Sequence, residues 1–158
     1  MSAEPHAQNT EDVMKNLKNK TFSICLTNHV MREGKKTKAH FLISSLGTEL
    51  GQYTGHTIED IYSIIFDILR PFIELKRVRV RRTTYSVPFP TNLSRQQHLV
   101  AQWLLETVRK DARKLSFNEK LRDELIRVLL RKGETIEKKK DLYKRAEKSR
   151  SFMHYRWY

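Results

Sequence analysis

The chain has few of the residues that crosslink a fold, interrupt helices or anchor a protein in a membrane. Among its 158 residues there is one cysteine, Cys25, so no disulfide can form within the chain. Five glycines and four prolines leave few places where a helix has to break. No run of 18 apolar residues occurs. The sequence therefore predicts a largely helical chain without a transmembrane span.

Catalytic motifs are also missing. The sequence has no Gly-rich phosphate loop, no Cys-x-x-Cys, no His-Glu-x-x-His and no Gly-x-Ser-x-Gly. A nuclease needs clustered carboxylates for Mg²⁺, whereas Glu106, Asp123 and Glu124 stand among lysines and arginines. Such carboxylates are typical of solvated ion pairs on helix faces. We therefore expect no catalytic residue, no metal site and no cofactor.

The excess of positive charge is the main feature of the composition. The chain has 31 Lys and Arg against 18 Asp and Glu, a formal net charge of +13. A domain this basic repels itself unless a polyanion is nearby, and nucleic acid is the most common such partner. An anionic membrane surface is the rival interpretation. Hydrophobic residues make up 39% of the chain, which is enough for one core in a single domain.

The N-terminal segment differs from the rest of the chain. The run MSAEPHAQNTEDV has no apolar stretch, so it does not resemble a secretory signal. It carries acidic residues and no arginine, so it is not an obvious mitochondrial presequence either, although such a tail could remain after processing. We expect a flexible polar tail over residues 1–19 and a single domain over residues 20–158.

Apolar residues recur at helical spacing in six segments, with no internal repeat. These segments are residues 17–30, 41–50, 57–69, 94–108, 116–129 and 135–146. Capping-box pairs predict three helix starts, namely Thr57 with Asp60, Ser94 with Gln97 and Ser116 with Glu119. We expect Thr135 to begin the last helix, Gly34 and Gly133 to end the first and fifth, and Gly51 and Gly55 to bracket a turn. Trp103 is expected in the core because it lies on an apolar helical stripe.

The period changes from 3.6 to 2 after Pro71, which is expected to end the third helix. In the run RVRVRR, Val78 and Val80 face one way and the arginines face the other. Alternation resumes after Thr84, and prolines at 88 and 90 confine the return strand to an edge or end it. This pattern predicts a β-hairpin over about residues 73–89, with a turn within 81–83, between the third and fourth helices.

Basic clusters occur in five places, at loops and helix ends as well as in the hairpin. The candidate RNA-binding residues in them are Lys35, Lys36, Lys38, Lys76, Arg77, Arg79, Arg81, Arg82, Arg109, Lys110, Arg113, Lys114, Lys138 and Lys139. One such cluster is usually a solvated face, but the guanidinium groups of the hairpin match phosphate oxygens in pairs. For the hairpin, nucleic-acid binding is therefore the favoured interpretation.

The last seven positions hold four aromatic residues and a histidine. This tail, about residues 150–158, includes His154, Tyr155, Arg156 and Trp157. Its aromatic rings can dock on the core, or they can stack on unpaired bases together with the arginine. The sequence leaves both alternatives open.

Ordered short motifs give the chain a family resemblance over about residues 20–158. They are Gly34-Lys35-Lys36, Arg70-Pro71 before a charged strand, Thr84-Tyr85-Ser86-Val87-Pro88, the Trp103 helix, Lys132-Gly133 and His154-Tyr155-Arg156-Trp157. In this order and spacing they resemble the universal small-subunit ribosomal protein seven family. The resemblance implies a mainly α fold, a six-helix bundle with a β-hairpin inserted between helices three and four.

The resemblance also implies a function. Members bind the 3′ major domain of small-subunit rRNA and nucleate assembly of the head, and they are not enzymes. The hairpin and the C-terminal region would lie near the mRNA exit and the E-site tRNA, beside small-subunit protein eleven. Lys35 and Lys36 would meet rRNA at the loop between helices one and two. Arg95, Arg109, Lys110 and Arg113 would contact rRNA around helix four, and residues 154–157 would lie in the tail.

Three departures from the family pattern are visible. Arg81-Arg82 stands where members usually carry two glycines, so the tip is expected to be wider or held by a partner. Gln102 replaces a common arginine, which could remove one rRNA contact. The basic N-terminal arm of bacterial members is replaced by the polar tail, so no RNA contact is assigned there.

Two short segments bear on the compartment. Arg95-Gln96-Gln97 and the ending Arg156-Trp157-Tyr158 are more similar to mitochondrial members than to typical bacterial ones. The expected location is the small subunit of the mitochondrial ribosome, with the bacterial cytoplasm or a plastid as alternatives. A basic helical adaptor that binds acidic proteins or anionic membranes is the alternative function. A small nuclease is a third and weaker hypothesis, given the missing carboxylate cluster.

Overall fold

The computed structural model describes residues 22–157, which form α-helices and one β-hairpin. Residues 22–30 are helical, and the elements that follow are α2 (Lys36–Thr54), α3 (Ile58–Leu69), β1 (Ile73–Val80), β2 (Thr83–Pro90), α4 (Leu93–Lys110), α5 (Phe117–Leu129), α6 (Glu134–Lys148) and the 3₁₀ helix η1 (Arg150–Trp157). This order confirms the predicted fold, with the hairpin between the third and fourth helices. The expected tail over residues 1–19 lies outside the described residues.

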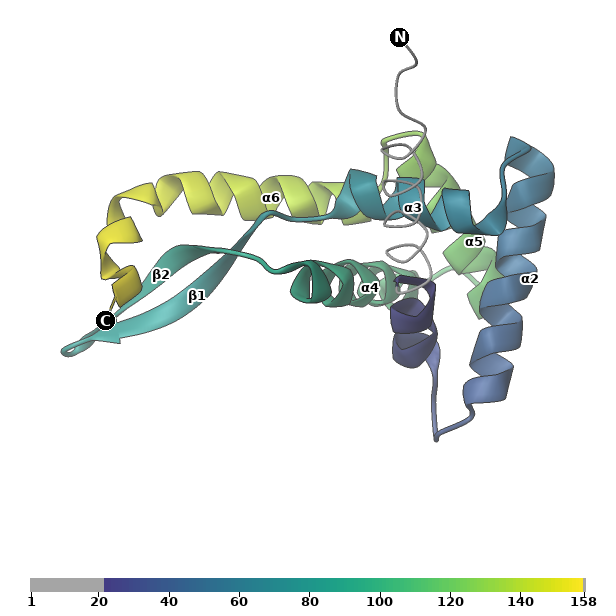
Figure 1. Cartoon of the computed structure of the whole chain (residues 1–158), viewed down its shortest axis with the longest axis horizontal. Helices are drawn as coiled ribbons and strands as arrows, with labels where there is room; N and C mark the ends of the chain where they lie inside the picture. Colours follow the sequence, from purple (N-terminus) through teal and green to yellow (C-terminus); the bar gives the residue numbers. More distant parts are fainter. Residues whose placement is uncertain (1–21, 158) are drawn as a thin grey trace, which may run out of the picture.

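The molecule has a helical body and an arm. Figure 1 shows the body around α2, α3, α4 and α5, and the arm extending from it as the long β1–β2 hairpin. Helix α6 leaves the body along the same direction as the hairpin, so that the C-terminal η1 meets β2 near the outer end of the arm. None of the helices within residues 22–157 is long and apolar enough to cross a bilayer.

The core lies in the body, where the apolar faces of the helices meet. Phe22 and Leu26 of the first helix are fully buried, and the Phe22 ring packs 5.2 Å from the ring of Phe66 in α3. Tyr62 is buried with its hydroxyl donating to the carbonyl oxygen of Ile43 at 2.8 Å, which links α3 to α2. Burial raises the pKa of this phenol well above its ordinary value, because the charged form would lose its hydration.

Two of the three predicted capping boxes are at helix starts. The Thr57 hydroxyl accepts a hydrogen bond from the Asp60 amide before α3, and the Ser116 hydroxyl accepts one from the Glu119 amide before α5. At Ser116 the box is complete, because the Glu119 carboxylate also accepts from the Ser116 amide at 2.9 Å. The third helix ends at Leu69, before Arg70 and Pro71, as predicted.

Other predicted helix ends are wrong. Ser94 lies inside α4, whose N-cap is Asn92, because the helix begins before the predicted box and already has helical backbone at Ser94. Thr135 lies inside α6, whose N-cap is Gly133, and α5 ends at Leu129 before that glycine is reached. The turn after α5 is made by Arg131 in the left-handed region, with φ of 55°.

Three further residues, which were predicted on apolar helical stripes or in a turn, lie in other surroundings than predicted. Gly51 is helical, since α2 continues to Thr54 and ends at Gly55, where φ is 70°. Phe41 lies on the solvent side of α2 with 76% of its surface exposed. Trp103 is half-buried beside Lys138 and Arg145 of α6, not in the main core, because it lies at the margin of the buried face of α4.

The hairpin is a regular antiparallel ladder from Ile73–Pro90 to Val80–Thr83. The turn holds Arg81 and Arg82 alone, so the expectation of a wider tip is wrong. Arg81 has φ of 55° and Arg82 does not take a positive φ, which is the pattern of a type II′ turn. A non-glycine residue in this region costs about 1–3 kcal/mol, which the paired ladder and its support can offset.

A buried carboxylate joins the end of the body to the start of α6. Glu124 of α5 is 4% exposed, and its Oε1 accepts from the Thr135 hydroxyl at 2.7 Å and from the Thr135 amide at 3.2 Å. Gly133 passes so close that an added Cβ would lie 3.1 Å from Oε1, and its φ is 114°. Glu124 therefore fixes where α6 leaves the body, and with it the direction of the arm.

Replacing Glu124 by Ala should lower the free energy of unfolding by about 1–3 kcal/mol, because the buried Thr135 amide loses its acceptor and the Thr135 hydroxyl keeps only its longer bond to Thr107, at 3.4 Å. Glu124→Gln should be less destabilising, since its amide oxygen can still accept. Urea denaturation followed by circular dichroism measures both. Glu147→Ala, at an exposed site on α6, is the control and should change the free energy by no more than about 0.5 kcal/mol. An equal destabilisation in the control and in Glu124→Ala would contradict this role.

Candidate nucleic-acid interface

The hairpin presents arginines on one face because the other face is supported. Val78 and Val80 are half-buried, while Arg77 and Arg79, which alternate with them, are exposed. Arg81 and Arg82 at the turn are exposed as well. None of these four arginines makes an ion pair or a side-chain hydrogen bond with another described residue. The guanidinium groups are therefore available for an external anion.

These four arginines (Arg77, Arg79, Arg81 and Arg82) are called the hairpin patch. Lys76 alternates to the other face of β1, the face of Val78 and Val80. Its ammonium group lies 5.2 Å from the centre of the Phe89 ring on the neighbouring strand. This cation–π contact holds the lysine stem against β2 while the charge stays at the exposed surface. The charge of Lys76 also lies near Glu74, and Arg95 first, then Lys76, lowers the pKa of the Glu74 carboxyl.

The C-terminal helix η1 docks on the hairpin. The ring of Tyr85 in β2 packs 4.9 Å from Phe152 and 5.0 Å from Tyr155, measured between ring centres. Arg156 donates from Nε to the carbonyl oxygen of Pro88 at 2.8 Å, and its guanidinium lies 5.9 Å from the Phe89 ring. Of the two alternatives for the tail, docking is the one observed, on the hairpin and not on the main core.

The remaining candidate residues of the tail are His154 and Trp157. The His154 ring lies 3.9 Å from the Tyr155 ring, and its Nδ1 is 2.9 Å from the carbonyl oxygen of Ser151. His154 is exposed, whereas Tyr155 and Arg156 are half-buried. The Trp157 side chain lies outside the described part of the chain. Base stacking by His154 stays a prediction.

A second basic region lies where the loop after the first helix meets the end of α4. Arg32, Lys35, Lys38 and Arg109 line a cleft of about 300 Å³, together with apolar residues that include Phe117. No carboxylate lines it, although the Lys35 ammonium is paired with Glu33 at 2.5 Å. Lys36 is exposed at the start of α2, beside this cleft in sequence. The structure thus brings the predicted Lys35, Lys38 and Arg109 together and adds Arg32.

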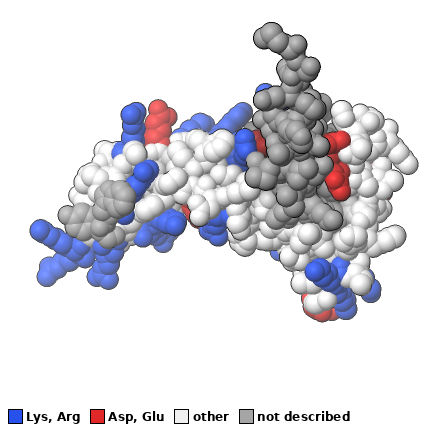
Figure 2. Space-filling model, viewed as in Figure 1, with Lys and Arg blue, Asp and Glu red and all other residues white. Residues whose placement is uncertain are grey.

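Positive charge gathers at the two ends of one side of the molecule. Figure 2 shows lysines and arginines at the tip of the arm and again around the loop between the first helix and α2. Both ends project to the same side, and the outline between them is concave, below α4. A folded polyanion can touch both basic regions at once across such a surface.

Several predicted residues are instead engaged in ion pairs within the fold. Arg95 is paired with Glu74 at 2.5 Å, which ties the start of α4 to the base of the hairpin. Lys110 and Lys138 both lie beside Glu106, at 3.1 and 3.3 Å. The two ammonium groups, that of Lys110 first, lower the pKa of the Glu106 carboxyl. Two lysines on one carboxylate still leave one net positive charge there.

Arg113 is held most firmly of the predicted set. It donates to Asp111 at 2.7 Å and to Asp123 at 2.9 Å, joining the α4–α5 connection to α5. The side-chain hydrogen bond from Arg113, followed by its backbone amide, lowers the pKa of Asp111 to about 2. This arginine organises the connection, whereas Lys114 beside it is exposed and has no such partner among the described residues.

Lys139 is half-buried and faces the fold. Its ammonium group donates to the carbonyl oxygen of Ile68 at 2.5 Å, which ties α6 to the end of α3. Burial, and secondarily the charge of Arg70, lowers the pKa of this lysine. Lys139 thus has a structural contact that its position in a Lys-Lys-Lys run did not indicate.

A histidine pair joins the first helix to α4 and was not found from the sequence. His29 Nε2 lies 3.0 Å from His98 Nδ1, and the rings are edge-on with centres 4.5 Å apart. The two residues are 69 positions apart, so no local spacing could indicate the contact. No group of three or more His, Cys, Asp or Glu residues suited to a metal ion occurs within residues 22–157.

The pair should make stability depend on pH. Partial burial, then the neighbouring His29 and Arg95, lowers the pKa of His98 below its ordinary 6.5. The unfolded chain therefore binds more protons in this range, so stability should fall as the pH is lowered from above 6.5 toward the folded-state pKa. We expect the urea midpoint of the native chain to drop between about pH 7.5 and 5.5, and His98→Gln to flatten this drop. His40→Gln, at an exposed histidine on α2, is the control and should leave the slope unchanged.

Comparison with known proteins places the chain among ribosomal sequences. The profile of the family described as ribosomal protein S7p/S5e matches residues 3–150. The chain is 35% identical over 130 residues to the small ribosomal subunit protein uS7 of Sulfurovum sp. (strain NBC37-1), which covers 82% of this chain and 83% of that protein. It is 32% identical, over the same length and shares, to the proteins of that name from Helicobacter hepaticus and Idiomarina loihiensis.

Proposed function

Because the chain belongs to the ribosomal protein S7 family, whose members are non-enzymatic structural proteins of the small ribosomal subunit, we propose that it binds the 3′ major domain of small-subunit rRNA and nucleates assembly of the head. The observation that carries this proposal is the hairpin patch. Four exposed arginines, two on β1 and two at the turn, stand together without an internal counter-charge among the described residues, on a hairpin whose valine face is supported. Such a surface suits the phosphates of a folded RNA.

The mechanism proposed is electrostatic docking without chemistry. Each phosphate neutralised by a lysine or arginine releases condensed counterions, so affinity should fall steeply with salt. Shape is the expected basis of selectivity, since the major groove of A-form RNA is too narrow for side chains to read. The hairpin patch and the cleft near Arg109 are separate basic regions. An RNA that fills both must present two phosphate clusters at the matching separation, which makes binding selective for the RNA fold.

The candidate residues divide by their internal contacts. Those that are exposed and have no carboxylate beside them among the described residues are the direct RNA ligands in this proposal, namely Lys36, Lys38, Arg77, Arg79, Arg81, Arg82, Arg109 and Lys114. Arg95, Lys110, Arg113 and Lys138 would approach RNA with their carboxylate partners attached, which reduces the net charge they contribute. Their effect on affinity is expected to be smaller.

The arm is the part proposed to lie near the mRNA exit and the E-site tRNA. It carries the hairpin patch and the docked η1 on one extended unit, held well away from the helical body (Figure 1). Protein eleven of the small subunit is the proposed neighbour of this unit. His154, which is exposed on η1, and Trp157 are the residues proposed to meet bases there.

The proposed location is the small subunit of the mitochondrial ribosome. The support is the likeness of Arg95-Gln96-Gln97 and of the C-terminal Arg156-Trp157-Tyr158 to mitochondrial members. An antibody against the chain, applied to fractionated source cells, should detect it with the small ribosomal subunits of mitochondria. Detection with plastid or bacterial subunits instead would assign it to that alternative compartment.

A binding titration tests the RNA proposal. The purified chain should bind a fragment of the 3′ major domain selectively, and the complex should survive an excess of transfer RNA as competitor. Binding should weaken as salt is raised, as counterion release requires. A chain that binds every RNA offered equally well would be a general basic adaptor, and the proposal would be overturned.

Replacing Arg77, Arg79 and Arg81 together by Ser should reduce the slope of log affinity against log salt by about three, one for each phosphate that is no longer neutralised. Affinity for the head fragment should fall at least about tenfold, while the free energy of unfolding changes by no more than about 1 kcal/mol, as expected for exposed sites. Fluorescence anisotropy across a salt series and urea denaturation measure the two effects.

The matched control removes the same charge outside the hairpin. Lys132, Lys140 and Lys148 are exposed and make no ion pair with a described residue, and their joint replacement by Ser also lowers the net charge by three. This control should weaken binding much less than the hairpin variant. An equal weakening would mean that overall charge, and not the hairpin patch, determines RNA affinity.

A further inference from the structure

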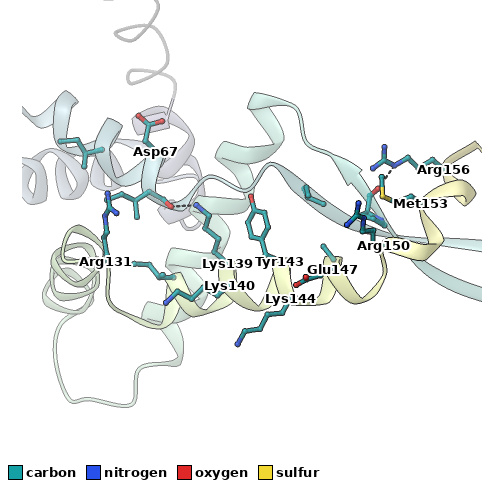
Figure 3. Close-up of a pocket in the computed structure, with 16 residues that line it drawn as sticks. Asp67, Arg131, Lys139, Lys140, Tyr143, Lys144, Glu147, Arg150, Met153 and Arg156 are labelled. Atoms are coloured by element: carbon teal, nitrogen blue, oxygen red, sulfur yellow. Dashed lines mark hydrogen bonds between the residues drawn. The ribbon is translucent and has the colours of Figure 1, made fainter.

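A groove of about 1340 Å³ runs along one side of α6, where the RNA proposal assigns no ligand. Its walls are α6 with η1 on one side and the end of α3 with the base of the hairpin on the other. Figure 3 shows the residues that line it, with Arg131 near one end and Met153 near the other. The lining residues of α6 extend from Ile136 to Glu147, roughly 16 Å at 1.5 Å per residue, and η1 continues the wall to Met153.

The floor of the groove is aliphatic. Ile64 and Ile68 of α3, Ile73 of β1, Ile136 of α6 and Met153 of η1 all face it. Ile64 and Met153 are each 39% exposed, at opposite walls. Contiguous exposed apolar side chains framed by charged residues are typical of a surface that binds another macromolecule.

The rim of the groove is basic. Six of the lining residues are Lys or Arg, and two, Asp67 and Glu147, are acidic. Arg131, Lys140 and Arg150 pair with no carboxylate among the described residues. In Figure 3 the Lys144 side chain points outward from α6, away from the floor. An occupant that satisfies this rim carries carboxylates beside its apolar side chains.

Three hydrogen bonds across the groove hold its walls in place. Lys139 donates to the Ile68 carbonyl at 2.5 Å, the Phe72 amide donates to the Tyr143 hydroxyl at 3.0 Å, and Arg156 donates to the Pro88 carbonyl. Figure 3 shows Lys139 and Tyr143 reaching across from α6. The groove is therefore formed in advance, which reduces the entropy that a ligand must lose on binding.

The floor does not suit RNA. Proteins recognise RNA through phosphates, 2′-hydroxyls and aromatic rings on which bases stack. Here the floor offers aliphatic side chains, and the hydroxyl of its one aromatic residue, Tyr143, already accepts a hydrogen bond. Aliphatic burial next to basic side chains is instead what an amphipathic protein segment needs.

We propose that this groove binds an acidic, amphipathic segment of another protein, whose apolar side chains cover Ile64, Ile68 and Met153 and whose carboxylates meet Lys140, Arg131 and Arg150. The RNA-binding surface and this groove then use different residues. The chain would contact RNA with its hairpin patch and the cleft near Arg109, and hold a protein along α6. The proposal does not depend on which RNA the hairpin patch binds.

Photo-crosslinking in cells tests the identity of the occupant. A benzoyl-phenylalanine residue is placed at Ile64 or at Met153 of the full chain, and cells are irradiated. Both positions should crosslink to the same segment of one protein, a segment in which apolar and acidic residues alternate or recur at helical spacing. The same residue placed at Tyr53, exposed on α2 outside the groove, controls for random surface crosslinking.

A synthetic peptide with the sequence of that segment then measures the affinity for the isolated chain. Ile64→Glu with Met153→Glu should weaken binding at least about fivefold, because the two substitutions put charge where the apolar side chains of the peptide are buried. Tyr53→Glu should leave peptide binding unchanged. Affinity for the head-domain RNA fragment should stay within about twofold in both variants, because neither alters the hairpin patch. A thermal melt of each variant confirms that it is folded.

Several outcomes would overturn the groove proposal. Crosslinks from Ile64 and Met153 to RNA, to a second copy of this chain, to its own residues 1–21, or to nothing beyond the Tyr53 background each contradict it. So does a peptide whose binding is unaffected by the double Glu variant. These results leave the RNA titration intact, so a failure here is distinct from a failure of the proposed RNA function.

Discussion

The support of the hairpin by the C-terminal half of the chain is the constraint on which the rest of the structure depends. A lone two-stranded hairpin is marginally stable in water, and the arginine face of this hairpin has no apolar surface that could be buried. The stack of Phe152 and Tyr155 on Tyr85, together with the hydrogen bond from Arg156 to Pro88, supplies the missing surface. Helix α6 extends along the hairpin, so that η1 after it can pack on β2. The arm therefore consists of two segments that are distant in sequence, the hairpin and α6 with η1.

This composite arm depends on anchors in the body. Glu124 holds the start of α6 through Thr135, and Lys139 ties α6 to the end of α3. Arg95 with Glu74 joins α4 to the base of the hairpin. Lysines and arginines therefore have two kinds of role here. Some act inside the fold through carbonyls and carboxylates, whereas those of the hairpin patch have no internal anion among the described residues and remain for an external one.

The same construction explains why the proposed RNA and protein surfaces can lie on one small chain. The strands expose alternate residues to opposite sides, so that arginines occupy one face of the hairpin and the other face rests on η1. The groove forms where α6 crosses from the body to the arm, and the hydrogen bonds of Tyr143 and Lys139 keep it open. Electrostatic binding and apolar binding are thus separated by the geometry of the arm.

The sequence by itself determined the helices, the hairpin and its alternation of valines with arginines, because periodicity reports directly which side chains share a face. It also determined the caps at Thr57 and Ser116, which act within four residues. Contacts between distant segments decided the rest. Helix starts at Asn92 and Gly133, the half-buried position of Trp103, the pairing of His29 with His98 and the inward contact of Lys139 all depend on neighbours far along the chain. A basic run looks the same in sequence whether its charges meet a carbonyl, a carboxylate or water, and only tertiary packing distinguishes these surroundings.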